Sequence, residues 1–277
     1  MSAFGAAGWT LAASVLLVAL FALTLKLRPS AEGDIVNAFG CQAIAYLAVL
    51  FVILRIHAPE ASIRALVGLR RTHVGIYPLA IGLGAAIGLP ANFAYAVLIE
   101  RFPTPDHGGI AEAFQKAAMG QRVAIGLIVV VLGPLLEELF FRGAIYRPLR
   151  MRHGARNACL LVGLYFGLAH TAEWQSQIPI ALVGVAVAGV RQWSGALGPA
   201  FAMHAAFNSV GLAQLALAPR LDFLDGPKPA WIVVAAAVSA LCLVAIARIG
   251  VHSSTGQIAR QRDLEDVVAC SARGRGT

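Results

Sequence analysis

Long runs of apolar residues, separated by short polar stretches, occupy most of this 277-residue chain. A helix needs about 20 apolar residues, each rising about 1.5 Å, to cross the hydrocarbon core of a bilayer. Segments that meet or approach this length are predicted as helices, at residues 7–26, 35–56, 76–99, 121–147, 157–172, 178–192, 195–217 and 229–249. The fifth and sixth are short, so we expect them to be tilted or buried. The pattern predicts an all-α, polytopic transmembrane helix bundle of about eight spans.

The composition excludes a soluble protein. The chain is 58% hydrophobic and 13% charged, whereas a soluble domain is about 45–50% apolar and about 25% charged. Its mean hydropathy is +0.74. Aromatic residues make up only 8% of the chain, which favours helices packed through small residues over a membrane β-barrel. We therefore expect a multi-pass protein of the cell membrane, with the lipid bilayer as its partner.

No internal repeat or long linker divides the chain, so residues 1–251 are predicted to form one transmembrane domain. From His252 onward the sequence is polar, mixed in charge and ends in Ser-Ala-Arg-Gly-Arg-Gly-Thr. Such a segment has too little apolar surface to fold by itself, so residues 252–277 are predicted to be a disordered polar tail.

The net charge of +8 comes from basic residues in the gaps between apolar runs. Positive charge at these places is a topology signal, so we predict no nucleic-acid partner. Of the 22 Lys and Arg residues, Arg142 lies inside a span and seven fall on one side of the predicted membrane: Lys26, Arg28, Arg101, Lys116, Arg122, Arg220 and Lys228. The remaining 14 fall on the side that holds both termini. Both termini are therefore predicted to be cytoplasmic.

Ionisable residues interrupt three of the predicted spans: Glu137 and Glu138 in the fourth, His170 in the fifth and His204 in the seventh. At membrane depth such side chains cost several kcal/mol unless they are paired or face a wet cavity, so each is a candidate functional residue. Counted from the basic side, Glu137 and His204 lie roughly 15 Å deep and His170 roughly 20 Å. These similar depths predict that three helices bring the residues to one cavity, open to the cytoplasmic side.

Two pairs of polar residues are four positions apart, on one face of a helix. Glu138 and Arg142 form one pair, which predicts a structural ion pair at the site. His204 and Asn208 form the other and are expected to face the same cavity. Neighbouring side chains on a helix point about 100° apart. We therefore expect Glu138 to contact Arg142, while Glu137 faces His170 and a water.

Three motifs in this part of the chain resemble those of the CPBP intramembrane endopeptidases, the type II CAAX prenyl endopeptidase, bacteriocin-processing and Abi family. The segment Glu137-Glu-Leu-Phe-Phe-Arg142 is similar to the family's EExxxR motif. Phe166-Gly-Leu-Ala-His170 is similar to its FxxxH motif, and His204-Ala-Ala-Phe-Asn208 to its HxxxN motif. The resemblance covers about residues 121–217, and the three motifs occur in the family's order.

The resemblance implies an intramembrane endopeptidase that cleaves a membrane-associated protein or peptide. Glu137 would be the general base that activates a water, assisted by His170. His204 and Asn208 would donate hydrogen bonds to the oxyanion of the tetrahedral intermediate. The family has also been called a metalloprotease family, and Glu137, His170 and His204 could instead hold a zinc ion. The chain has no HExxH motif, so the sequence requires no cofactor.

Two other classes of function use buried polar residues. A proton-coupled membrane transporter also needs Glu, His and Arg within the bundle, but the spans show no inverted repeat. A non-catalytic membrane scaffold of the same fold would not need two buried carboxylates. The loops do not indicate which substrate is cut, whether it is prenylated, or the oligomeric state.

Overall fold

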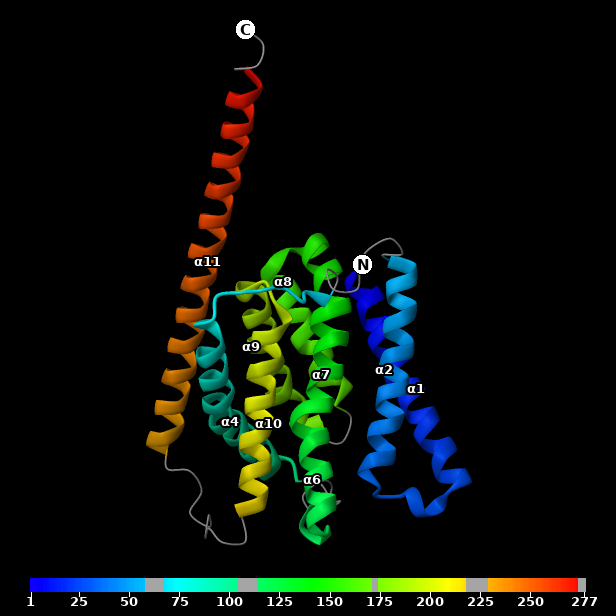
Figure 1. Cartoon of the computed structure of the whole chain (residues 1–277). Coiled ribbons are helices and arrows are strands. Elements are labelled where there is room, and N and C mark those ends of the chain that lie inside the picture. Colours follow the sequence, from blue (N-terminus) through cyan, green and yellow to red (C-terminus); the bar gives the residue numbers. More distant parts are fainter. Residues whose placement is uncertain (58–66, 104–113, 171–173, 218–228, 274–277) are drawn as a thin grey trace.

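The computed structural model describes residues 1–57, 67–103, 114–170, 174–217 and 229–273, with side chains up to Val251. Within these ranges the chain is helical and contains no strand, and the helices pack side by side into a bundle (Figure 1). The predicted all-α helical membrane bundle is confirmed. Along the chain, the α-helices are α1 (Ala3–Leu27), α2 (Ile35–His57), α4 (Ile76–Arg101), α6 (Met119–Leu127), α7 (Gly133–Glu138), α8 (Tyr146–Ala169), α9 (Trp174–Ser194), α10 (Leu197–Leu217) and α11 (Pro229–Arg273).

Within the described residues, each predicted segment coincides with a helical region, and residues 171–172 of the fifth segment lie outside the described residues. Five helical ranges among the described residues are long and apolar enough to cross a membrane: Ala3–Leu27, Ile35–Ile56, Ile76–Arg101, Met119–Ala169 and Pro229–Val251. The range Met119–Ala169 joins the fourth and fifth predicted spans. Helices α9 and α10 are not among the five, so the count of about eight spans is not confirmed.

The fourth and fifth predicted spans are joined by helix where the sequence predicted a loop. Helix α8 begins at Tyr146 and is kinked at Gly154, where φ is 78° and ψ is 170°. This conformation is essentially restricted to glycine, because a Cβ atom would clash with the backbone. The basic residues near Gly154 therefore belong to α8 and not to a loop between two helices.

Small residues allow the helices around the site to approach closely. Gly163 of α8 and Gly184 of α9 face each other, and a Cβ added to Gly184 would come within 3.1 Å of the Gly163 Cα. Gly84 of α4 lies directly against the backbone of Met203 in α10. Such contacts hold helices together in membranes, where the hydrophobic effect does not. They fix α10, with its His204, against the rest of the bundle.

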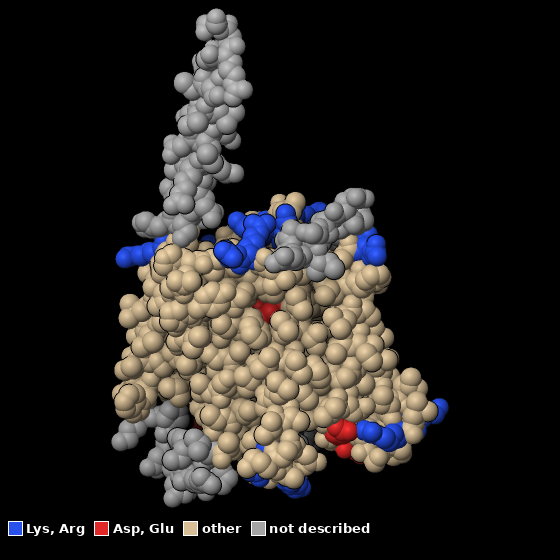
Figure 2. Space-filling view, in the orientation of Figure 1, with Lys and Arg blue, Asp and Glu red and all other residues tan. Residues whose placement is uncertain are grey.

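Both chain ends lie at the same end of the bundle (Figure 1). Lys and Arg side chains gather at that end, and further Lys, Arg and acidic side chains lie at the opposite end (Figure 2). Between the two ends the face in view is uncharged except for an acidic spot below the first (Figure 2). This arrangement agrees with the predicted topology of a multi-pass membrane protein, and the cytoplasmic location of the termini stays a prediction. Helix α11 continues to Arg273 and projects beyond the bundle (Figure 1), so helix occupies most of the segment expected to be disordered. The division of the chain at residue 252 stays a prediction.

Candidate active site

The glutamate pair lies on a short α-helix between two π-helical stretches. α7 is preceded by η2 (Ile128–Leu132) and followed by η3 (Leu139–Ile145). In η2 the N–H of Gly133 donates to the carbonyl of Ile128, five residues back. Pro134 has no N–H with which to continue the α-helical pattern, and this favours the wider turn. π-Helical turns are rare and often occur at functional sites, because they change the direction in which side chains point.

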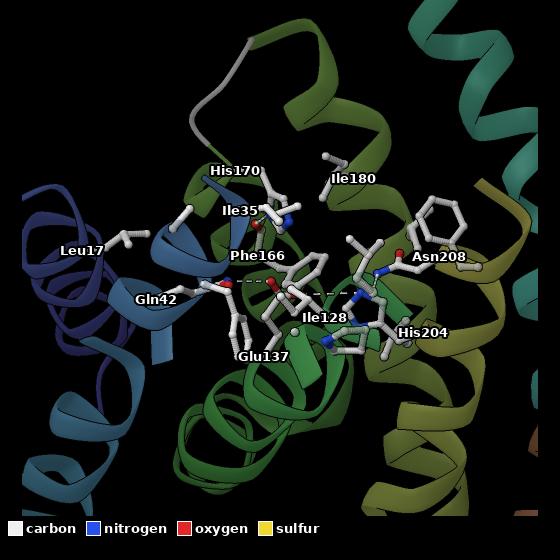
Figure 3. Close-up of a pocket in the computed structure, with 18 of the residues that line it drawn as sticks. Leu17, Ile35, Gln42, Ile128, Glu137, Phe166, His170, Ile180, His204 and Asn208 are labelled. Atoms are coloured by element: carbon white, nitrogen blue, oxygen red, sulfur yellow. Dashed lines mark hydrogen bonds and ion pairs between the residues drawn. The ribbon is translucent and has the colours of Figure 1, made fainter. Parts of the chain in front are cut away.

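A cavity of about 640 Å³ lies between α1, α2, η2, α7, α8, α9 and α10 (Figure 3). Its walls are largely apolar. Its polar lining residues are Gln42, Glu137, His170, His204 and Asn208. The four residues predicted to be catalytic thus lie around one cavity, as their similar depths predicted. Whether it opens to the cytoplasm stays a prediction.

Glu137 is buried, and each of its two carboxylate oxygens has a neighbour from another helix. Oε1 accepts a hydrogen bond of 2.9 Å from Nε2 of Gln42 in α2. Oε2 lies 3.6 Å from Nε2 of His204 in α10. Glu137 and His170 line the same cavity, and no direct hydrogen bond joins them in the described part of the chain. The water expected between them stays a prediction. The rotation of α2 and α10 about their own axes, which the sequence does not specify, determines the partners of Glu137.

Glu138 and Arg142 form the predicted ion pair, with 2.9 Å between Oε1 and Nη1. Both side chains are fully buried. Arg142 also donates through Nη2 to the carbonyl of Gly184 in α9, at 2.8 Å. Its guanidinium lies over the ring of Phe166, 4.6 Å from the centroid. Arg142 therefore ties the helix of the glutamate pair to α8 and α9.

His204 lies between the two carboxylates. Its Nδ1 is 3.0 Å from Oε1 of Glu138, and its Nε2 faces Oε2 of Glu137. An ion-paired carboxylate only accepts hydrogen bonds, so Nδ1 of His204 carries a proton. Nε2 can donate toward Glu137 or the cavity only when His204 is doubly protonated. The sequence predicted Glu138 as a partner of Arg142 alone, whereas the structure adds His204.

His170 ends helix α8 and is held by its own helix. Its Nδ1 is 2.8 Å from the carbonyl oxygen of Phe166, one turn earlier. A carbonyl only accepts, so Nδ1 is the donor, and Nε2 of the neutral ring is left as an acceptor. The ring of Phe166 lies 4.7 Å from that of His170 and 5.4 Å from that of His204. Phe166 therefore packs against both imidazoles.

Asn208 lies one turn after His204 on α10, as the four-residue spacing predicted. Its Nδ2 donates to the carbonyl of Val129 in the π-helical stretch η2, at 2.8 Å. An asparagine amide carries two N–H donors. One binds the backbone of η2 and holds the amide in place, which leaves a second for a group in the cavity.

The residues suggested as metal ligands do not form a ligand set. Among the residues that the structure describes, no group of three or more His, Cys, Asp or Glu side chains is close enough to hold a metal ion. Glu137 and His204 approach one another, and His170 donates through Nδ1 to a backbone carbonyl, which leaves its Nε2 unprotonated in the neutral ring. Whether the protein depends on a metal stays a prediction.

The fold and the site define a helical membrane protein with a charged cluster inside its bundle. Residues 119–210 match the model of the family described as type II CAAX prenyl endopeptidase Rce1-like. The match confirms the resemblance inferred from the three motifs, and it covers about a third of the chain. It supports an intramembrane endopeptidase in general and does not distinguish a glutamate mechanism from a metal-dependent one. Comparisons with curated proteins and with solved structures found no match.

Gln42 is the site residue that the sequence did not reveal. It lies in α2, outside the matched residues, as a single polar side chain in the apolar segment Gly40-Cys-Gln-Ala-Ile44. No helical spacing links Gln42 to a motif residue. A sequence pattern therefore could not have distinguished it from a glutamine whose hydrogen bond has no connection with the site.

Proposed function

We propose that this protein is an intramembrane endopeptidase that hydrolyses a peptide bond of a membrane-associated protein or peptide. The observation that carries the proposal is that residues of all three family motifs line one cavity. The apolar walls suit a substrate whose scissile bond adjoins an apolar segment. The family is named for prenylated CAAX proteins, and a substrate of that class would place its lipid against these walls.

In the proposed mechanism Glu137 takes a proton from a water in the cavity, and Nε2 of His170 helps to orient that water. The hydroxide attacks the carbonyl carbon of the scissile bond, which gives a tetrahedral intermediate with a negatively charged oxygen. His204 and Asn208 donate hydrogen bonds to that oxygen. Glu137 then returns the proton to the leaving nitrogen as the C–N bond breaks.

The charges of the buried cluster support this assignment. Glu137 and Glu138 carry two negative charges, and Arg142 carries one positive charge. An oxyanion donor requires an N–H on Nε2 of His204, while Nδ1 already contacts Glu138. The proposal therefore requires a proton on both nitrogens of His204, which lies between Glu137 and Glu138 and gives a cluster with no net charge.

The proposed function is tested by comparing peptide termini in cells that carry the wild type or Glu137→Ala. We expect termini of one or a few membrane-associated proteins to appear with the wild type and to be absent with the variant. Identical sets of termini in both cells would contradict proteolysis. Solute flux in vesicles that depends on Glu137 would instead support a transporter.

Asn208→Ala should lower kcat, because one donor to the oxyanion is lost while Glu137 and His170 remain. If Asn208 behaves like other single donors, the loss is about 2.7–4 kcal/mol of transition-state stabilisation, or about 10²–10³ in rate. Steady-state kinetics of the purified protein in lipid would measure it. The exposed Asn92→Ala is the control, since Asn92 bonds Gln214 away from the main cavity. A normal kcat in Asn208→Ala would remove Asn208 from the mechanism.

Metal chelation should leave the activity unchanged, because the described residues offer no three-ligand group. The purified protein would be treated with a strong chelator, assayed, and its zinc content measured. Stoichiometric zinc that disappears in both His170→Ala and His204→Ala, with activity restored by one divalent ion, would replace the glutamate mechanism with a metal-centred one.

A further inference from the structure

Helix α2 contributes one polar side chain to an otherwise apolar part of the cavity wall. The lining residues from α1 and α2 are Leu17, Val18, Phe21, Ile35, Ala38, Phe39 and Gln42. Gln42 is partly buried, and its side chain also lies within hydrogen-bonding reach of Tyr46 on its own helix. Its Nε2 donates to Oε1 of Glu137, 95 residues further along the chain (Figure 3).

This bond determines how Glu137 presents its carboxylate. A carboxylate in a cavity with apolar walls can rotate about its terminal bond, and then either oxygen can face the water. The donor on Gln42 holds Oε1, so Oε2 is the oxygen directed at His204. Oε2 is then the atom that would accept a proton from a water in the cavity.

The position of Gln42 is fixed by aromatic packing one turn later on the same helix. Tyr46 is buried and stacks on Phe140 of η3, with 4.9 Å between ring centroids. It also meets the edge of Phe141 at 6.2 Å. Residues four apart share a face of a helix, so this packing holds Gln42 at the level of Glu137. Aromatic pairs of this kind favour one defined geometry.

We propose that Gln42 is a positioning residue for Glu137, and that the α1–α2 helix pair thereby completes the active site from outside the family-matched residues. The inference rests on the proposed function, because it assigns Gln42 a role through the general base. It gives the N-terminal helices a part in the reaction besides anchoring the protein in the membrane.

The test compares the full-length wild type with Gln42→Met and Gln42→Glu in lipid vesicles. The probe is an internally quenched peptide that spans the cleavage site found from the peptide termini. Methionine keeps the length of glutamine and removes the donor, whereas glutamate keeps the shape and replaces the donor with an acceptor. We expect kcat to fall about tenfold or more in Gln42→Met and further in Gln42→Glu, with KM unchanged, because a hydrogen bond to a charged group is lost.

The matched control is Asn37→Leu, also on α2. Asn37 bonds Thr24 of α1 and does not line the cavity, so its loss weakens the helix pair without touching Glu137. Its kcat should stay near that of the wild type. Thermal unfolding of each variant shows whether it is folded, and if Gln42→Met does not fold, Gln42→Glu alone is used for the comparison.

A double-mutant cycle separates a positioning role from a purely structural one. Glu137→Asp keeps a carboxylate but shortens it by one methylene, beyond the reach of Gln42. In that background Gln42→Met should change kcat by less than about twofold, because the interaction is already lost. An equal fall in both backgrounds, or a normal kcat in Gln42→Met, would overturn the inference. If instead Glu137→Gln is fully active, the proposed function itself fails.

Discussion

Replacing Glu137 with glutamine should lower turnover by about two to four orders of magnitude. The substitution keeps the shape of the side chain, and its amide oxygen can still accept the hydrogen bond from Gln42. It removes the group that takes a proton from water. Substrate binding should survive, because the cavity keeps its volume and the donors His204 and Asn208 are unchanged. Single-turnover kinetics and direct measurement of peptide binding would separate the two effects.

Glu32→Gln is the control for this substitution, because it changes an exposed carboxylate in the turn between α1 and α2. Its activity should equal that of the wild type. A Glu137→Gln variant with normal kcat would exclude Glu137 as the base. Loss of peptide binding in that variant would show that Glu137 contributes to substrate recognition as well.

Replacing Arg142 with alanine should destabilise the protein by about 3–5 kcal/mol. The guanidinium is fully buried and interacts with the carboxylate of Glu138, the carbonyl of Gly184 and the ring of Phe166. Removing it leaves the charge of Glu138 with His204 as its remaining partner. Thermal unfolding in detergent and the yield of folded protein would measure the loss.

Two further variants test this explanation. The double variant Arg142→Ala with Glu138→Ala should recover part of the stability, because no unpaired charge stays buried. Arg152→Ala, an exposed arginine of α8, should unfold like the wild type. An unfolding temperature of Arg142→Ala equal to that of the wild type would show that the buried pair does not stabilise the bundle.

The sequence predicted the helices well because hydropathy and length identify membrane segments directly. It also predicted contacts within one helix, such as Glu138 with Arg142, since residues four apart share a face. Contacts between helices were predicted less well. Most of these helices are apolar on every side, so the pattern does not show which face turns inward. For this reason the bonds of Glu137 to Gln42 and of Glu138 to His204 were missed.

The kinked helix around Gly154 and the two π-helical stretches were also absent from the prediction. The polar, arginine-rich segment before Gly154 has the composition of a loop, but it continues the helix at the basic end of the bundle. The π-helical turns depend on a missing N–H group and on the packing around it. A search for a period of 3.6 residues averages over such local changes.

The π-helical stretches make the length of this segment as important as its composition. Each wide turn holds one more residue than an α-helix needs for the same rise, so the deletion of one residue within η3 is absorbed by a return to regular α-helix. The helix beyond the deletion then keeps its direction, and a deletion between Glu138 and Arg142 leaves them three residues apart, still on one face. A one-residue insertion enlarges a turn that is already wide, and where the chain continues as α-helix the side chains beyond it rotate by about 100° relative to Glu138. Variants lengthened by one residue between Ile128 and Ile145 should therefore lose more activity than variants shortened by one, even when every motif residue is retained.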